Sequence, residues 1–157
     1  MIRRYGWGPL SERVVSDVPF GHWKTSTFLA GLTTHGLIAP LIVDGPMNGA
    51  TFLAYVQQQL TRELRPDNIV VLDNLSCHKV AGVREAIEST GATLFYLPPY
   101  SPDLNPIELA FSKLKTLFRK LAARTVDELW TQIPHVLDQF SSEECENYIK
   151  HCGYTAR

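Results

Sequence analysis

The sequence predicts an α/β fold in which helices flank a mixed sheet. Two apolar runs on either side of "TTHG" indicate a β-hairpin in the first third of the chain. Strands and helices then alternate, and the short apolar runs "IVVLD" and "ATLFYL" are typical of buried parallel strands. A chain of 157 residues can bury one core, so we expect residues 1–157 to form a single domain.

The first half of the chain is expected to contain the hairpin, one helix and one buried strand. Residues 27–32 and 37–43 are the hairpin strands. "GPMN" is a turn in which Asn48 can cap a helix over "ATFLAYVQQQLTREL", whose apolar residues recur on one face. "RPDN" ends that helix, and residues 69–73 follow as the strand.

The second half is expected to be mainly helical. Residues 74–91 form a loop and a helix closed by Gly91, and a strand at 92–97 ends at two prolines. The remaining predicted helices are 106–123, one that begins at Thr125 in the capping box "TVDE", and 142–151. Residues 125–157 are treated as a C-terminal helical extension of the same domain.

The composition indicates a soluble globular protein. Hydrophobic residues make up 45% of the chain and the net charge is −1, which argues against a disordered or fibrous class. No apolar run approaches the roughly 18 residues that span a bilayer, so no membrane partner is expected. Three cysteines without disulfide or zinc spacing suit the reducing cytoplasm.

Asp73 is the first candidate for chemistry, because it follows the apolar strand "IVVL" directly. Open α/β sheets bind their ligands beyond the carboxyl ends of such strands. The structural alternative is a turn, in which Asp73 or Asn74 caps the next segment.

Glu108 is the second candidate, and it too has a structural alternative. It stands at the third position of a helix that Asn105 could cap and Pro106 could begin, which is the pattern of a capping box. Glu108 nevertheless lies off the apolar stripe of that helix and in line with Lys115 and Arg119. The stripe comprises Ile107, Ala110, Phe111, Leu114, Leu117, Phe118 and Leu121.

A pair of carboxylates on rigid supports suits metal-dependent phosphodiester cleavage. Mg²⁺ prefers oxygen ligands, and divalent ions can activate the attacking oxygen and stabilise the leaving one. A strand end would hold Asp73, and the proline-rich turn "LPPYSPDLNP" would hold Glu108 with little loop entropy.

The stretches "VVLDNLSCHK" and "GATLFYLPPYSPDLNPIELAFSKLK" resemble the DDE endonuclease domain of bacterial insertion-sequence transposases related to the mariner group. Thirty-four residues, 74 to 107, separate Asp73 from Glu108, as in that family. "RRYGWGP", "GHWKTSTFLAGL" and "VDGPMNGATFLAYV" are similar to the same group, so the resemblance covers nearly the whole chain.

The resemblance implies a ribonuclease-H-like fold, Mg²⁺ or Mn²⁺ at three carboxylates, and cutting and rejoining of double-stranded DNA at transposon ends and target. Asp73 matches the second acidic residue of the family and Glu108 the third. The implied location is the bacterial cytoplasm, in association with the nucleoid.

The resemblance also implies that the first strand, with the first aspartate, is missing. That strand should precede "RRYGWGP", and residues before Tyr5 cannot supply it. Asp17 lies in an expected loop, and Asp44 ends a strand two positions away, so neither is a good substitute. We therefore expect the C-terminal part of a split or decayed transposase, with an upstream helix-turn-helix product as its partner.

Several cations and aromatic residues are candidates for binding DNA or a second subunit. The DNA-binding candidates, by charge or position, are Lys113, Lys115, Arg119, His78 and Lys24. Each has an alternative as ordinary surface or as an anchor of the N-terminal arm. The stripe of Trp130, Ile133, Val136, Leu137 and Phe140 predicts a packed helix, and an exposed part of it could join a homodimer.

The sequence thus favours a transposase catalytic domain that performs metal-dependent strand cleavage and strand transfer. Two alternatives stay open: a catalytically inactive remnant that binds DNA or a partner, and a metal-dependent nuclease without strand transfer.

Overall fold

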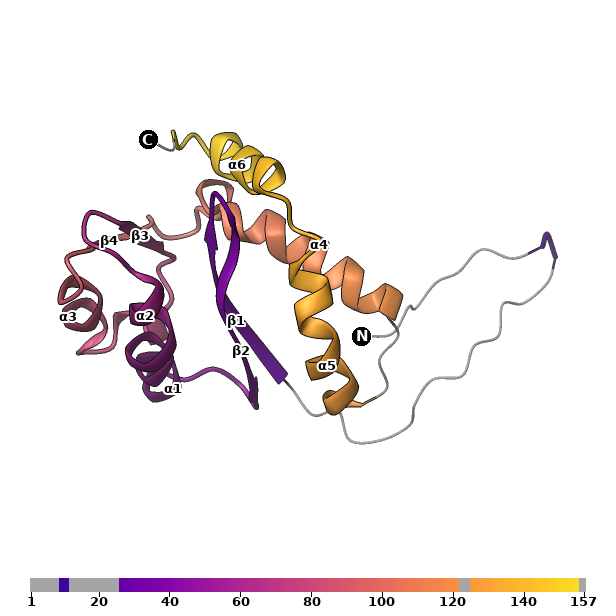
Figure 1. Cartoon of the computed structure of the whole chain (residues 1–157), viewed down its shortest axis with the longest axis horizontal. Coiled ribbons are helices and arrows are strands. Elements are labelled where there is room, and N and C mark those ends of the chain that lie inside the picture. Colours follow the sequence, from indigo (N-terminus) through magenta and orange to yellow (C-terminus); the bar gives the residue numbers. More distant parts are fainter. Residues whose placement is uncertain (1–8, 12–25, 122–124, 156–157) are drawn as a thin grey trace.

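The computed structural model describes residues 9–11, 26–121 and 125–155 (Figure 1). The strands are β1 (Ser26–Thr33), β2 (Gly36–Asp44), β3 (Ile69–Leu72) and β4 (Thr93–Tyr96). The α-helices are α1 (Gly49–Tyr55), α2 (Thr61–Glu63), α3 (Val83–Glu88), α4 (Pro106–Leu121), α5 (Val126–Leu137) and α6 (Ser142–His151). Shorter helical turns are a π-turn at Val56–Leu60 and 3₁₀ turns at Ser76–Lys79 and Pro102–Leu104.

The predicted hairpin is confirmed and is slightly longer than expected. Strands β1 and β2 pair antiparallel from Ser26↔Asp44 to Thr33↔Gly36, with an irregularity between Leu29 and Gly31. The turn uses Gly36 at φ 144°, a backbone angle that residues with a side chain rarely adopt.

The predicted helix after the hairpin is also confirmed. The side chain of Asn48 accepts a hydrogen bond from the backbone N–H of Thr51 at 2.9 Å, as a helix cap does. The helical run continues through the π-turn into α2 and ends at Glu63. The π-turn was not predicted, because an apolar pattern gives the face of a helix but not its hydrogen-bond spacing.

Strands β3 and β4 form a parallel pair, in register from Ile69↔Thr93 to Leu72↔Tyr96. Their carboxyl ends therefore lie at the same edge. Beyond the last pair, the N–H of Leu97 still bonds to the carbonyl of Leu72 at 2.8 Å. The two segments that leave these strands start side by side.

Both strand pairs rest on one core, yet they form two separate two-stranded sheets. Buried residues of α1, α3 and the π-turn, such as Phe52, Val56 and Ile87, pack against Leu29 of β1 and Val70 of β3. The expected single mixed sheet is not closed within the described residues, because no described strand bonds between β1 and β3.

A second core lies on the other side of the hairpin, where α4, α5 and α6 pack (Figure 1). Its buried members are Ala110, Leu114, Val136, Phe140 and Cys145. Phe28 of β1 joins it by edge-on contacts with the rings of Phe111 and Phe118 at 6.1 and 6.3 Å. The predicted apolar stripe of α4 is thus the packed face of that helix, although Leu121 at its end is 39% exposed.

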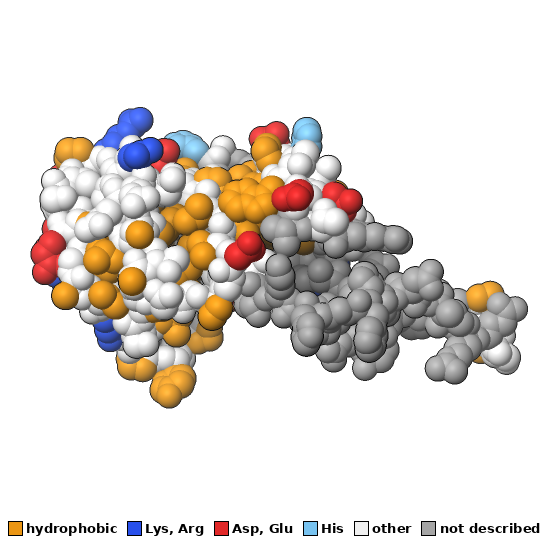
Figure 2. Space-filling view, turned by 90° about the horizontal axis from the view of Figure 1, so that it is seen from below, with side chains coloured by type: hydrophobic (Ala, Val, Ile, Leu, Met, Phe, Trp, Pro, Cys, Tyr) orange, Lys and Arg blue, Asp and Glu red, His pale blue; other side chains and the backbone are white. Residues whose placement is uncertain are grey.

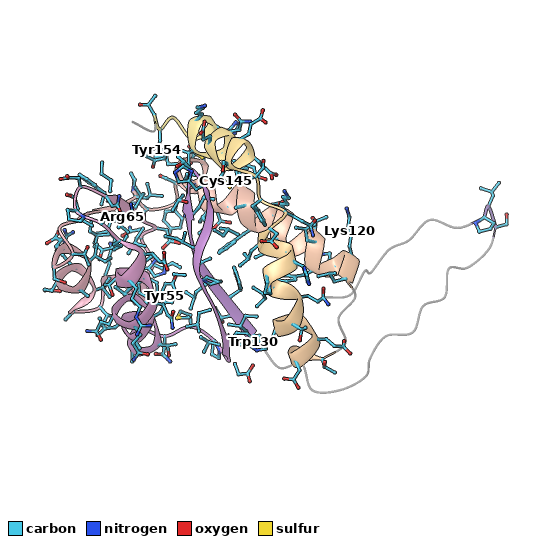
Figure 3. The ribbon with its side chains drawn as sticks, viewed as in Figure 1. Tyr55, Arg65, Lys120, Trp130, Cys145 and Tyr154 are labelled. Atoms are coloured by element: carbon cyan, nitrogen blue, oxygen red, sulfur yellow. The ribbon has the colours of Figure 1, made fainter. Side chains whose placement is uncertain are left out.

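The helical extension packs on this second core. Thr125 caps α5 by accepting a hydrogen bond from the N–H of Glu128 at 3.1 Å, as the sequence predicts. Cys145 of α6 is fully buried, whereas Trp130 of α5 is 43% exposed (Figure 3). Among the described helices, none is long and apolar enough to cross a membrane.

Candidate active site

Asp73 and Glu108 line one open cavity of about 400 Å³. Two chain segments form its walls, one after β3 and one between β4 and α4. The lining residues are Asp73, Asn74, Leu75, Ser76, Leu97, Pro98, Pro99, Tyr100, Ser101, Pro102, Asn105 and Glu108. The parallel pairing of β3 and β4 explains the meeting, because both segments leave the same edge of the pair.

Asp73 uses one carboxylate oxygen to fold its own loop. Its Oδ1 accepts a hydrogen bond from the N–H of Leu75 at 3.1 Å, and His78 Nδ1 lies 2.6 Å from the same oxygen. The turn role considered from the sequence is therefore present. No hydrogen bond from the described residues reaches Oδ2, so the second oxygen remains available to a ligand.

His78 lies against Asp73, a contact that the sequence analysis did not foresee. It belongs to the 3₁₀ turn Ser76–Lys79, and its ring stacks on Phe52 with centroids 4.2 Å apart. The side chain is 15% exposed. The sequence shows only that His78 follows Asp73 by five positions. This spacing does not predict the contact, because the direction of a side chain in a loop does not follow from its position in the sequence. A DNA contact by His78 stays a prediction.

Glu108 stands exposed in the first turn of α4. The capping alternative is not realised, because the Glu108 and Asn105 side chains make no hydrogen bond with the described residues; the 3.1 Å bond between them joins backbone atoms. A 3₁₀ turn, Pro102–Leu104, precedes the helix.

The C-terminal extension holds the proline-rich turn from outside. The hydroxyl of Tyr154 donates to the carbonyl of Leu104 at 2.8 Å, across 50 residues of sequence. Burial raises the pKa of Tyr154 above its ordinary value, so the phenol stays protonated and able to donate. Sequence reasoning missed this contact, since Tyr154 has no motif that points to the turn.

The cavity can attract a cation. Its lining holds two carboxylates and no Lys, Arg or His. Like charges that share a site repel, and a divalent ion relieves that repulsion. The oxygen-only donors suit Mg²⁺, which keeps several waters and binds through one or two carboxylates. Within the described part of the chain, no group of three potential ligands gathers, so water or phosphate would complete the coordination.

The other acidic candidates stand apart from this cavity. Asp44 pairs with Ser26 at the end of the hairpin and is not among the residues that line the cavity. Asp17 lies outside the described residues.

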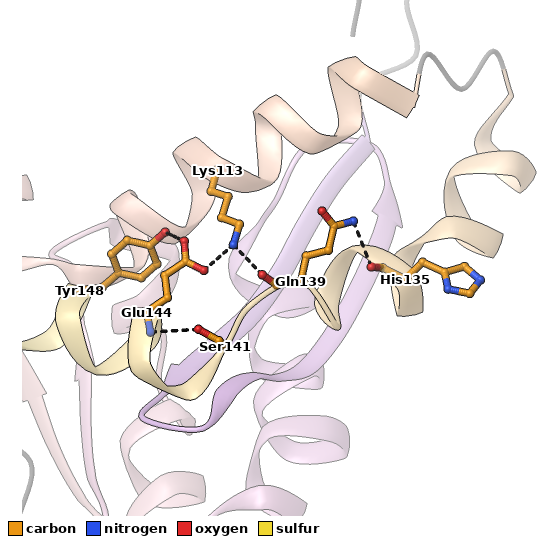
Figure 4. A network of polar contacts seen from close by, with 6 residues as sticks. All are labelled: Lys113, His135, Gln139, Ser141, Glu144 and Tyr148. Carbon is orange, nitrogen blue, oxygen red and sulfur yellow. Dashed lines mark hydrogen bonds and ion pairs between the residues drawn. The ribbon is translucent and has the colours of Figure 1, made fainter.

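The predicted DNA-binding cations differ in how they are engaged. Lys115 and Arg119 are exposed on α4. Lys113 instead donates to the carbonyl of Gln139 at 2.6 Å and pairs with the carboxylate of Glu144 (Figure 4). Lys24 lies outside the described residues.

Comparison with known proteins gives a family and a fold. Residues 1–130 match the family described as DDE superfamily endonuclease. No curated protein matches the chain.

Solved structures of Mos1 transposase are similar in fold at low sequence identity. The Mos1 paired-end complex with left transposon end superimposes with a TM-score of 0.74 at 17% identity, covering 96% of this chain and 47% of that one. The catalytic domain of Mos1 mariner transposase superimposes with a TM-score of 0.61 at 14% identity, covering 82% of this chain and 73% of that one. The Mos1 catalytic domain with Raltegravir and Mg superimposes with a TM-score of 0.58 at 15% identity, covering 85% of this chain and 84% of that one. The chain thus spans about half the length of the Mos1 chain in the complex, and the likeness confirms the expected ribonuclease-H-like fold.

Proposed function

The chain belongs to the DDE superfamily endonuclease family, and from that premise we propose that it is the catalytic part of an insertion-sequence transposase. Its substrate is double-stranded DNA, at transposon ends and target, and its reactions are strand cleavage and strand transfer. The observation that carries the proposal is the shared cavity of Asp73 and Glu108, which contains acidic oxygens and no basic side chain.

Asp73 and Glu108 are the residues that hold a divalent ion, Mg²⁺ or Mn²⁺, in this proposal. The bound metal supplies charge neutralisation at the phosphodiester and activation of the attacking oxygen. Asp73 contributes through Oδ2, because Oδ1 is already engaged. The Mos1 catalytic domain has been solved with Mg and with Mn, which supports the choice of metals.

The turn before α4 is proposed to keep Glu108 in place. The turn between β4 and α4 leads into the helical turn that carries Glu108, and the hydrogen bond from Tyr154 to Leu104 restrains it. A restrained ligand loses little entropy when the substrate complex forms.

DNA contact is proposed for the exposed side of α4. Lys115 and Arg119 lie on the helix whose first turn carries Glu108, so a phosphate backbone that enters the cavity can follow them. On the face in Figure 2, the described Lys and Arg side chains lie at the margins of the left-hand part. Lys113 should contribute less, because Glu144 already pairs with its ammonium group. Lys24 stays a prediction.

A further polypeptide is proposed to complete the sheet. Each of β1 and β3 is paired on one edge within the described chain, although both pack on the same core. An upstream helix-turn-helix product that carries the first strand and aspartate would satisfy both edges. Slower amide exchange at β1 and β3 on mixing the two products supports this, and unchanged exchange contradicts it.

Two lesser proposals concern assembly and location. A homodimer through α5 would cover Trp130, which is 43% exposed. The proposed location is the bacterial cytoplasm, with the protein bound to nucleoid DNA.

A catalytically inactive remnant is the second candidate function. It is favoured by one observation, that the described residues bring together two carboxylates and no third ligand. Such a remnant would bind DNA or a partner without turnover.

Nicking of supercoiled plasmid in Mg²⁺ or Mn²⁺ tests the leading proposal. Asp73→Asn and Glu108→Gln should abolish nicking, and thermal unfolding of both variants checks that the fold is kept. The matched control is Asp103→Asn, which removes an exposed carboxylate of the same turn that does not line the cavity. Nicking that survives both site substitutions would refute the assignment, and metal-independent DNA binding without nicking would favour the remnant.

A further inference from the structure

His78 forms a polar contact with Asp73, one of the two proposed metal ligands. His78 Nδ1 lies 2.6 Å from Asp73 Oδ1, and the two side chains are 15% and 33% exposed. This oxygen already accepts the N–H of Leu75 at 3.1 Å. Two nitrogen atoms therefore converge on one oxygen of the carboxylate, and none of the described residues engages the other.

The short distance favours a proton on Nδ1 of His78. Nδ1 is buried and has no aligned hydrogen bond with the described residues, but Asp73 Oδ1 lies 2.6 Å from it. If Nδ1 were bare, two lone pairs would face each other at 2.6 Å and the buried nitrogen would have no partner. The approach is attractive only when Nδ1 carries the hydrogen, and a small rotation of the side chains would then align it with Oδ1.

His78 is held by one contact of its ring and two hydrogen bonds of its backbone. Its ring stacks on Phe52 of α1, with centroids 4.2 Å apart and planes at 36°. The carbonyl of His78 accepts the hydroxyl of Tyr96 at 2.9 Å, and its N–H donates to the carbonyl of Leu75 at 3.1 Å. The donor therefore has a fixed position relative to the end of β3.

We propose that His78 is a positioning residue, which fixes the Asp73 carboxylate by donating Nδ1–H to Oδ1 and so leaves Oδ2 for the metal. The inference rests on the proposed function in one respect, namely that Asp73 is a metal ligand. Without the His78 donor, only the N–H of Leu75 holds the carboxylate, so the direction of Oδ2 is less well defined. Partners that orient ligating groups typically account for about 10–100-fold in metal affinity.

Two substitutions of His78 separate positioning from packing. His78→Phe keeps a ring on Phe52 but removes the donor. His78→Asn places an amide nitrogen near the position of Nδ1 and restores the donor, although it loses the stacked ring. Thermal unfolding of both variants of the full 157-residue chain reports how much the ring contributes to the fold.

Calorimetric titration with Mn²⁺ alone is the first measurement. His78→Phe should bind Mn²⁺ about 10-fold more weakly than the parent, and His78→Asn should recover most of that loss. Equal affinity of His78→Phe and the parent overturns the proposal, as does an asparagine variant that binds no better than the phenylalanine variant.

Nuclear magnetic resonance of the metal-free chain is the second measurement, and it stands independently of catalysis. The parent should carry a proton on Nδ1 of His78 and show one side-chain rotamer of Asp73 by three-bond couplings. In His78→Phe those couplings should average. A parent that binds no Mn²⁺ would count against the proposed function, and these couplings would still decide the positioning role. A parent with averaged Asp73 couplings, or with a bare Nδ1, overturns it.

Discussion

Replacing Lys113 by methionine removes the cation that joins α4 to the extension (Figure 4). The Lys113 ammonium donates to the carbonyl of Gln139 at 2.6 Å and to the carboxylate of Glu144, which also accepts the hydroxyl of Tyr148. It lies 4.6 Å from the ring centroid of Phe140. Methionine keeps an apolar stem beside that ring, so the change reports mainly on the charge.

The expected cost lies between that of a surface pair and that of a buried pair. The Lys113 and Glu144 side chains are 26% and 30% exposed. Exposed ion pairs contribute about 0.2–1 kcal/mol, and hydrogen bonds to charged groups about 1.5–3 kcal/mol. We expect Lys113→Met to lower the free energy of unfolding by about 1–2 kcal/mol, because solvent screens part of the interaction. For a domain of this size, that corresponds to about 2–8 °C in Tm.

The pH dependence of stability has a defined sign. Partial burial works to raise the pKa of Glu144, but hydrogen bonds from Lys113 and Tyr148 outweigh it and lower the pKa below its ordinary value of 4.5. A carboxyl whose pKa is lower in the folded state contributes stability that is fully present above pH 4.5. That contribution is lost as the pH falls through the lower folded value, and Lys113→Met should reduce the loss.

Thermal unfolding of Lys113→Met, Glu144→Gln and the double variant tests the pair. The double variant should cost less than the sum of the single variants, by about 0.5–1 kcal/mol. Lys115→Met is the matched control, an exposed lysine of the same helix, and should leave the Tm nearly unchanged. A Lys113→Met variant as stable as this control, or strictly additive costs, would refute the reasoning.

Three further predictions concern the turn, a glycine and the DNA surface. Tyr154→Phe removes the hydrogen bond to the carbonyl of Leu104, so it should lower the free energy of unfolding by about 1 kcal/mol and reduce nicking. Unchanged nicking would show that the turn keeps its conformation without this bond. Gly82→Ala should cost about 1–2 kcal/mol, because Gly82 has φ +94°; a Tm equal to the parent's would contradict this strain. Replacing Lys115 and Arg119 together by serine should reduce the slope of log binding constant against log salt by about 2, and an unchanged slope would exclude both as phosphate contacts.

Local signals in the sequence were sufficient for most of the elements. Helix α6 spans Ser142–His151 as expected, since Ser141 caps it through the N–H of Glu144 at 3.2 Å. The hairpin followed from two apolar runs around a short turn. The separation into two sheets did not follow from these signals, because strand pairing depends on segments distant in sequence.

The meeting of the two acidic residues was predictable from the sequence, whereas the partners of their side chains were not. Parallel pairing of β3 and β4 places Asp73 and Glu108 in one cavity, and their metal-binding role stays a prediction. The pairing of His78 with Asp73 depends on a ring from α1, and Lys113 pairs with a carboxylate 31 residues later. Such contacts are set by tertiary packing, which residue spacing does not encode.

The two carboxylates are attached to different hydrophobic cores, and the β1–β2 hairpin packs against both cores. Asp73 is fixed through β3 and His78 to the core around Phe52, whereas Glu108 lies in the first turn of α4, which packs on the second core. Alternate residues of β1 divide between them, with Leu29 facing the first core and Phe28 the second. The separation of the two carboxylates therefore depends on the hairpin as well as on the cavity walls. A strand that paired with the open edges of β1 and β3 would stiffen the hairpin, and it would act on the geometry of the site even before it supplied a ligand.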